Sequence, residues 1–204
     1  MVGAKPAMIK MNKPFSQACE NNKKFILEQL VRCFANSYKI LEVGSGTGQH
    51  AVYFAPNLPH LVWQTSDQSH YHGGIHTWLA QHPADNLKTP ITLTIGQDSW
   101  PEIRVDGVFT ANTTHIMQAC DAKLMMQTIT QNLCQGGVFC QYGPFNIDGQ
   151  YTSDSNEHFD RHLKNEGCGG IRDIAELQRW APGLELQETI PMPANNFLLV
   201  WIKS

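Results

Sequence analysis

The feature that most restricts the fold of this chain is a short apolar run that leads into three closely spaced glycines. The run covers residues 39–43, the glycines are Gly44, Gly46 and Gly48, and a segment of helical composition, 48–54, follows. A strand that passes through a glycine loop into a helix is typical of open α/β sheets, which bind ligands at the carboxyl ends of their strands. Glycine in such a loop adopts positive φ angles and lets a ligand approach the backbone. We therefore predict an α/β domain with a binding site beside this loop.

Apolar and β-branched runs alternate with helix-like segments along the rest of the chain, a pattern typical of parallel βαβ units. The predicted strands are 39–43, 61–65, 91–95, 107–111, 137–142, 184–189 and 196–202, and the predicted helices are 48–54, 72–81, 121–134 and 173–180, with an N-terminal helix around 26–34. Only residues 190–195 separate the last two strands, which is too short for a crossover helix. We therefore expect a seven-stranded, mostly parallel sheet with an antiparallel terminal hairpin and helices on both faces.

The spacing of the glycines distinguishes between two classes of ligand. Dinucleotide-binding enzymes have the pattern G-x-G-x-x-G, which requires a glycine where this chain has Gln49. Here the pattern is G-x-G-x-G, two residues after Glu42. This arrangement, like the terminal hairpin, resembles the Rossmann-like class I methyltransferases that use S-adenosylmethionine, whose positive charge suits a carboxylate. We expect Ser45 of the loop to contribute to the same site; a glycine-rich turn without a ligand is the alternative.

Polar residues also follow the second and third predicted strands. Asp67 comes about 20 residues after the glycine loop, where an acid accepts hydrogen bonds from the ribose of an adenosine ligand. We expect its neighbour Gln68 at the same site, although Asp67 also fits a helix N-cap. In class I methyltransferases the loop after the third strand lies beside the adenine, and Asp98, Ser99 and Trp100 suit that position. The alternative for this loop is an Asx-turn with a core tryptophan.

The segment after the fourth predicted strand holds Asn112 and His115, which we expect near the transferred methyl group. Histidine has an ordinary pKa of about 6.5, so His115 is the best candidate for a general base; a structural histidine is the alternative. The prolines that amino-methylating DNA enzymes have at this place are missing. His70, His72 and His76 lie close together in sequence but match no recognised ligand pattern, so we predict no metal site.

Charge and hydropathy argue against two classes of partner. Lys and Arg number 15 and Asp and Glu 18, a net charge of −3 that does not favour nucleic-acid binding. Two stretches without charged residues, 43–66 and 124–147, exceed the roughly 20 residues that span a bilayer, but both contain several glutamines, histidines or prolines. Residues 1–15 lack a signal peptide's apolar core, and the six cysteines form no C-x-x-C pair. We expect a cytoplasmic protein that binds neither membranes nor nucleic acids.

Six longer stretches resemble the family called domain of unknown function 938, which includes the animal methyltransferase-like protein 26. They are FSQACENNKKFIL at 15–27, ILEVGSGTGQHAVYFA at 40–55, WQTSD at 63–67, YGPFNIDGQYTSDSNEHFD at 142–160, GIRD at 170–173 and MPANNFLLV at 192–200. The resemblance covers nearly the whole chain. It implies a class I methyltransferase fold with S-adenosylmethionine as the cofactor, and it leaves the methyl acceptor open.

The resemblance also implies roles for particular residues. The family's cofactor signature corresponds to Glu42, Gly44, Gly46, Gly48, His50 and Asp67, and its E-x-N-K pattern, expected over the methionine end of the cofactor, to Glu20, Asn22 and Lys23. The segments 142–145 and 193–196 are expected around the acceptor, which adds Tyr142 to His115 as a candidate catalytic residue. After the fourth strand, residues 113–118 depart from the family's more apolar pattern.

These observations predict one methyltransferase-like domain over residues 1–204, with an N-terminal helical cap at 1–36 and a substrate cover at 143–183. The predicted activity is direct methyl transfer from S-adenosylmethionine to a small molecule or another acceptor that is not a nucleic acid. Two alternatives remain at this point. One is a non-catalytic S-adenosylmethionine- or adenosine-binding or interaction protein with the same fold, and the other is an NAD-dependent oxidoreductase.

Overall fold

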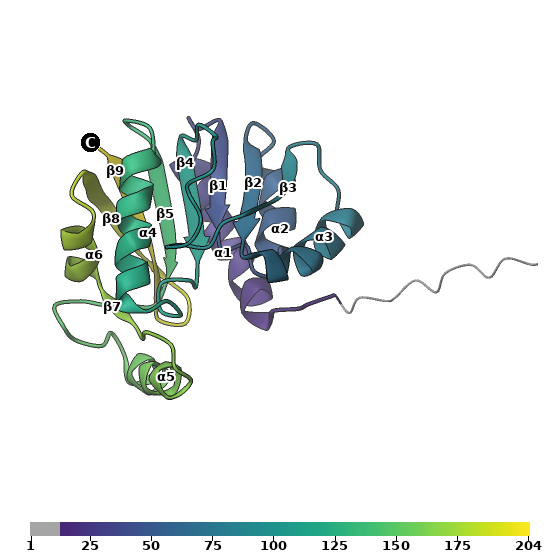
Figure 1. Ribbon diagram of the computed structural model, residues 1–204. Helices are drawn as coiled ribbons and strands as arrows, with labels where there is room; N and C mark the ends of the chain where they lie inside the picture. The colour runs from purple at the N-terminus through teal and green to yellow at the C-terminus, as the bar shows by residue number, and fades with distance from the viewer. Residues whose placement is uncertain (1–12) are drawn as a thin grey trace, which may run out of the picture.

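A twisted seven-stranded sheet forms the centre of the computed structural model, which describes residues 13–204 (Figure 1). Its order is β3-β2-β1-β4-β5-β9-β8, with β1 Lys39–Val43, β2 Val62–Asp67, β3 Leu87–Thr92, β4 Gly107–Ala111, β5 Val138–Gly143, β8 Leu184–Met192 and β9 Asn196–Lys203. Strands β1 to β5 are parallel, whereas β9 runs antiparallel to both β5 and β8. The predicted sheet with its antiparallel terminal hairpin is therefore confirmed.

Helices cover both faces of this sheet, as the sequence predicted. They are α1 Gln17–Cys33, α2 Gln49–Asn57, the 3₁₀ helix η1 Ser69–Tyr71, α3 His72–Gln81, α4 Ala119–Asn132, α5 Asp154–Asn165 and α6 Ile174–Trp180. Residues of α1 and α2 pack in one buried cluster, and residues of α4 and α6 pack in another. In β9, Leu198 and Val200 belong to the first cluster and Leu199 and Trp201 to the second, because side chains alternate between the faces of a strand.

The third strand lies earlier in the chain than predicted, at Leu87–Thr92 instead of 91–95. The strand forms an edge of the sheet, where a proline such as Pro90 is tolerated although it lacks a ladder donor. The apolar residues that suggested a strand at 91–95 continue into a turn instead. In that turn the Asp98 carboxylate accepts a hydrogen bond from the backbone N–H of Thr94 at 2.7 Å.

The segment 143–183, predicted as a cover, contains α5 and α6 and a two-stranded sheet of β6 Phe145–Asn146 and β7 Arg172–Asp173. Helix α5 lies beyond the edge at which the parallel strands end (Figure 1). Its N-cap is Ser153, whose side chain accepts from the backbone N–H of Asn156. The first twelve residues of the predicted N-terminal cap lie outside the described residues.

Within residues 13–204, no helix combines the length and the hydrophobicity that crossing a membrane requires.

Candidate functional site

A cavity of about 750 Å³ lies at the carboxyl edge of the parallel strands, a volume typical of sites for small molecules. The glycine loop, the ends of β2, β4 and β5, and the first turns of α1 form its walls. Residues of α5 and of the β8–β9 turn complete them. The cavity therefore lies where the sequence placed the binding site.

The glycine loop leaves room for a ligand at one of its glycines. Gly44 has φ +74°, and a Cβ there would lie 2.6 Å from Cγ2 of Thr113, so this glycine permits a close approach of two loops. Gly46 has φ +57°, and among residues 13–204, apart from Gly46 and its two chain neighbours, no heavy atom lies within 4 Å of the place where its Cβ would be. Gly44, Ser45 and Gly46 line the cavity, whereas Gly48 packs against Ile75 of α3.

Asp67 presents a fixed carboxylate to the cavity. Its Oδ2 accepts from the backbone N–H of Gly46 at 2.6 Å, and its Oδ1 accepts from that of Gln68 at 2.7 Å. Burial raises the pKa of this carboxyl above its ordinary value, while the two backbone donors oppose the rise. Gln68 lines the cavity next to it, so the structure brings together two residues predicted for the same site.

Glu42, by contrast, lies behind the loop and does not line the cavity. Its Oε2 accepts from the Ser45 hydroxyl at 2.9 Å and from Nε1 of Trp63 at 3.1 Å. Burial raises the pKa of this carboxyl to about 7, and nearby Asp67 adds to the rise. Glu42 therefore supports the glycine loop from the core. Its side chain lies on the same face of β1 as that of Ile40, which packs in the cluster under α1 and α2.

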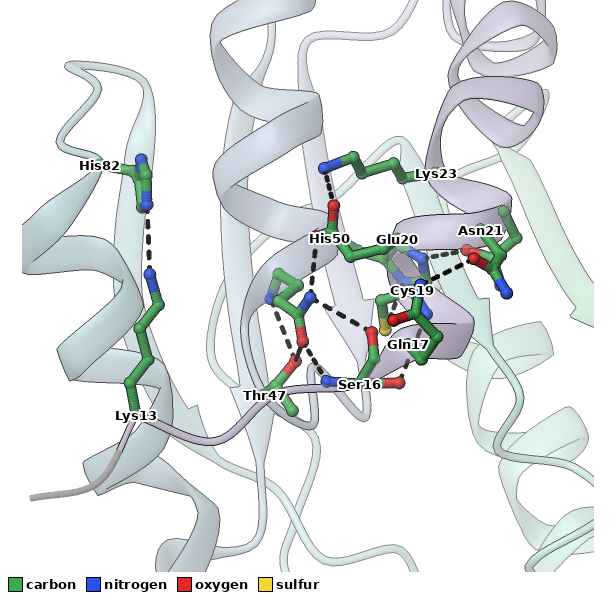
Figure 2. Close-up of polar contacts among 12 residues, drawn as sticks. Lys13, Ser16, Gln17, Cys19, Glu20, Asn21, Lys23, Thr47, His50 and His82 are labelled. Carbon is green, nitrogen blue, oxygen red and sulfur yellow. Dashed lines mark hydrogen bonds and ion pairs between the residues drawn. The ribbon is translucent and has the colours of Figure 1, made fainter.

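The residues 13–22, which we call the strap, cross one end of the cavity and are held by α2 and α3 (Figure 2). Nε1 of Trp78 donates to the carbonyl of Pro14 at 2.6 Å. Oε1 of Gln49 accepts from the backbone N–H of Ser16 at 2.5 Å, and its Nε2 donates to Glu20 at 2.8 Å. The glycine spacing indicates only that Gln49 does not suit a dinucleotide site; its role in holding the strap depends on contacts between residues about 30 positions apart, which the spacing does not reveal.

Two residues that the family resemblance singled out meet at the end of the strap, Asn22 in the strap itself and His50 on α2. Nε2 of His50 lies 2.7 Å from Oδ1 of Asn22, and both side chains line the cavity. The His50 ring stacks on Phe54 with a centroid distance of 5.1 Å. Burial lowers the pKa of His50 to about 4, so the ring is neutral near pH 7.

The two candidate catalytic residues, His115 and Tyr142, line the cavity together with Asn112. Asn112 has φ +57°, an uncommon conformation for this residue type, and its backbone N–H donates to the carbonyl of Tyr142 at 2.9 Å. Burial lowers the pKa of His115 to about 4 and raises that of Tyr142. The His115 ring packs edge-to-face against Phe159 of α5, with the centroids 5.4 Å apart.

The loop after β3 takes a different place from the one predicted for it. Asp98 and Ser99 are exposed, Trp100 packs against the cluster under α4, and none of the three lines the cavity. Their neighbours Gly96 and Gln97 line a second hollow of about 470 Å³, whose wall also includes Gln68. The structure therefore does not bring the predicted adenine contacts to the other predicted residues.

The neighbouring histidines contact the backbone and each other. Nε2 of His72 lies 3.0 Å from the carbonyl of Asp67, and the rings of His72 and His76 are 6.4 Å apart. His70 packs against Tyr71, with the ring centroids 4.1 Å apart. Residues 13–204 contain no group of three His, Cys, Asp or Glu side chains that could hold a metal ion.

Helix α5 supplies cavity residues that sequence analysis did not single out, namely Ser155, Asn156 and Phe159. The helix is attached to the β8–β9 turn, because Nδ2 of Asn156 donates to the carbonyl of Asn195 and Nδ2 of Asn195 donates to Ser155, each at 3.0 Å. The serine cap and the amphipathic pattern of 153–165 could have predicted the helix. Nothing in that pattern indicates which part of the sheet it contacts.

A family model described as "Protein of unknown function (DUF938)" matches residues 13–203. The fold is similar to that of an O-methyltransferase family 2 protein from Planctomyces limnophilus, solved in complex with apigenin (TM-score 0.73, 16% identity, 89% of this chain covered). It is also similar to the S-adenosylmethionine-dependent methyltransferase SibL in its apo form (TM-score 0.75, 16% identity, 91% of this chain covered). A third similar structure is human N-acetylserotonin methyltransferase in complex with SAM (TM-score 0.68, 11% identity, 89% of this chain covered). This chain spans 62%, 55% and 55% of the lengths of these three structures.

Proposed function

The chain belongs to the DUF938 family, and on this basis and that of its site we propose that it is an S-adenosylmethionine-dependent methyltransferase acting on a small molecule. The observation that supports this most directly is the cavity at the carboxyl edge of the sheet, where the open backbone of Gly46 adjoins the buried carboxylate of Asp67. We also infer kinship with the animal methyltransferase-like protein 26. Solved structures of similar fold include proteins described as bound to SAM or SAH.

The residues present fit this cofactor. Asp67 has the chemistry to accept hydrogen bonds from ribose hydroxyls, and the space at Gly46 lets a ligand lie against the loop backbone. Asn22 of the strap and the neutral His50 form a polar surface suited to the amino-acid end of the cofactor. When bound, S-adenosylmethionine supplies an activated methyl group on a positively charged sulfur.

The chain's own contribution to catalysis is alignment and exclusion of water. The strap, residues 13–22, covers one side of the cavity, and the cover segment 143–183, through α5, covers another. We assign both to the single domain as its cap and its substrate cover. Burial of His115 and Tyr142 keeps bulk water away from the place where we expect the acceptor.

His115 is the proposed general base for an acceptor that arrives protonated. Its lowered pKa leaves the ring neutral near pH 7, with a nitrogen lone pair that accepts a proton. The Tyr142 hydroxyl, whose pKa is raised, stays protonated and donates a hydrogen bond. Asn112, in its left-handed conformation between them, orients the turn that presents His115.

The test is calorimetric titration of the purified protein with S-adenosylmethionine and S-adenosylhomocysteine, together with mass spectrometry of any ligand that co-purifies. We expect binding of both compounds with micromolar dissociation constants. Absence of binding at millimolar ligand would refute the proposal, and binding of NADH in their place would favour an oxidoreductase. Binding without methyl transfer to any member of a broad acceptor panel would favour a non-catalytic role.

A further inference from the structure

The charges around the cavity restrict the kind of acceptor that fits. Among the described residues, Asp67 is the one acidic side chain on the cavity wall, and the wall contains neither lysine nor arginine. His50 and His115 are neutral there, because burial lowers the pKa of each to about 4. Glu20 and Lys23, at the edge of the strap, form an ion pair with each other.

An acceptor with a carboxylate or phosphate group would lose its hydration in this cavity without gaining a cationic partner, which is costly. Asp67 would repel it as well. A cationic acceptor would compete with the positively charged cofactor for the same carboxylate, and the described wall offers no second one. An uncharged acceptor avoids both penalties.

The wall on the side of α5 is apolar and partly open to solvent. Ile116 and Phe159 line the cavity although 56% and 38% of their surfaces are exposed, and Met117 and Pro144 also line it. Large apolar side chains that remain exposed around a cavity mark a surface that binds an apolar partner. The edge-to-face contact of His115 with Phe159 places one aromatic ring beside the candidate base.

Uncharged polar groups on the cavity wall are suited to orienting one hydroxyl, amine or thiol. The Tyr142 hydroxyl donates a hydrogen bond, the neutral His115 ring accepts one, and the Asn112 amide does either. A few polar groups within an apolar wall are typical of sites that hold a mostly apolar ligand in one orientation.

We propose that the methyl acceptor is a small, uncharged molecule whose aromatic or similarly flat apolar body packs between Phe159 and Ile116, with its reactive heteroatom toward His115 and Tyr142. This inference rests on the proposed function and adds the substrate class. In the transfer, a lone pair of the heteroatom forms the bond to the methyl carbon as the carbon–sulfur bond breaks. The electron pair of that bond stays on sulfur, and the proton of the heteroatom passes to the His115 ring.

The test compares two probes of nearly the same shape, 2-naphthol and 2-naphthoate, on protein saturated with S-adenosylhomocysteine. Binding is measured by saturation-transfer NMR and by calorimetry, so that no turnover is needed. We expect 2-naphthol to bind at least about tenfold more tightly than 2-naphthoate, because only the carboxylate loses solvation without a partner. Equal or tighter binding of 2-naphthoate would overturn the proposal that the acceptor is uncharged. Failure of 2-naphthol to bind would overturn the proposal that the acceptor has a flat aromatic body.

Two variants connect the result to the proposed wall. Phe159→Ala should weaken the binding of 2-naphthol by about five- to tenfold, because the lost ring area faces the acceptor. The affinity for S-adenosylhomocysteine should stay unchanged. Phe25→Ala, which removes a ring exposed on α1 away from the cavity, is the matched control and should change neither. Equal effects of the two variants on 2-naphthol binding would contradict the assignment of Phe159 to the wall that contacts the acceptor.

Ile116→Arg should reverse the preference toward 2-naphthoate, since it places a cation on an exposed part of the wall without disturbing the core. An unchanged preference in the folded variant would overturn the placement of the acceptor. S-adenosylhomocysteine binding is measured separately in each protein. Its absence from the unmodified protein would refute the proposed function, whereas its presence without 2-naphthol binding would refute only the acceptor class.

Discussion

At the scale of single residues, two buried carboxylates have different roles because they lie on opposite sides of one loop. Asp67 faces the cavity and accepts from two backbone N–H groups, whereas Glu42 faces the core and accepts from a hydroxyl and an indole. Both were predicted as cofactor residues. The two roles can be separated by experiment, since one affects ligand binding and the other affects stability.

Replacing Asp67 with asparagine should weaken binding of S-adenosylhomocysteine by about 10- to 100-fold. The reason is that hydrogen bonds to a charged group contribute about 1.5–3 kcal/mol, and the amide offers one acceptor oxygen in place of two. Calorimetric titration measures the change. Asp98→Asn, at an exposed carboxylate outside the cavity, should leave the affinity within about twofold, less than 0.5 kcal/mol. Equal losses in the two variants would contradict this placement of the ribose.

Replacing Glu42 with glutamine should flatten the dependence of stability on pH. The pKa of Glu42 is about 7 in the folded protein against 4.5 for the free side chain, so the folded state binds more protons between these values. The free energy of unfolding therefore falls as pH rises from 4.5 to 7, by about 3 kcal/mol from this group. Glutamine keeps the acceptor oxygen for Ser45 and Trp63 and does not titrate.

Urea unfolding of both proteins between pH 4.5 and 8 measures this difference. His50 and His115 act in the opposite direction, because their lowered pKa values give stability that is present above pH 6.5 and lost as pH falls toward 4. They are unchanged in the variant, so the difference between the two profiles isolates Glu42. Parallel profiles would show that Glu42 titrates normally.

At the scale of elements, the strap depends on Gln49 at the first position of α2. Gln49→Ala removes the contacts with Ser16 and Glu20 and leaves a backbone N–H without its partner. We expect faster hydrogen exchange in residues 16–22 and about tenfold faster dissociation of S-adenosylhomocysteine, corresponding to about 1.4 kcal/mol. Hydrogen-exchange mass spectrometry and stopped-flow fluorescence measure the two effects.

Gln17→Ala is the matched control for the strap, because Gln17 is exposed and its side chain contacts Asn21 of the same helix. It should leave both rates unchanged. If Gln49→Ala also left them unchanged, the strap would not depend on this side chain.

The sequence predicted best those elements whose turn residues and apolar pattern agree with the way the element packs in the fold. The helix at 72–81 and the strands at 39–43 and 107–111 have the predicted boundaries, because turn residues and apolar pattern coincide there. The third strand was misplaced because its apolar pattern continues past the edge of the sheet into a turn closed by Asp98.

For the site, the glycine spacing and the position of Asp67 were enough to locate the cavity, since both follow from the ends of parallel strands. The loop of Asp98, Ser99 and Trp100 could not be placed in this way, because its conformation depends on local turns. The contribution of α5 depends on bonds to a turn about 40 residues later in the chain, which periodicity does not reveal.

At the scale of the whole molecule, the last strand connects the core to the candidate base. Nε1 of Trp201 donates to Oε1 of Gln141, and Nε2 of Gln141 donates to the hydroxyl of Thr114, the residue before His115. Trp201→Ala should lower the free energy of unfolding by about 3–5 kcal/mol, a large share of the stability of a typical domain. Urea unfolding measures it.

Trp180→Ala is the comparison for this variant, since Trp180 packs against the same cluster and is only partly buried. A smaller loss is expected there. Equal losses of unfolding free energy in the two variants would contradict the idea that Trp201 on β9 contributes more to stability than other tryptophans of this cluster.

The position of β9 between β5 and β8 also has a consequence for how the chain folds during its synthesis. Strands β1 to β5 leave the ribosome first, but β8 joins the sheet through β9, which is made after it. Until β9 has emerged, the nascent chain exposes the unpaired edge of β5, and until residue 195 has emerged it lacks the turn that holds α5 over the cavity. The candidate site is therefore among the last parts of the domain to form, and the unpaired edge of β5 is open to aggregation in a ribosome-bound intermediate that no ligand yet stabilises.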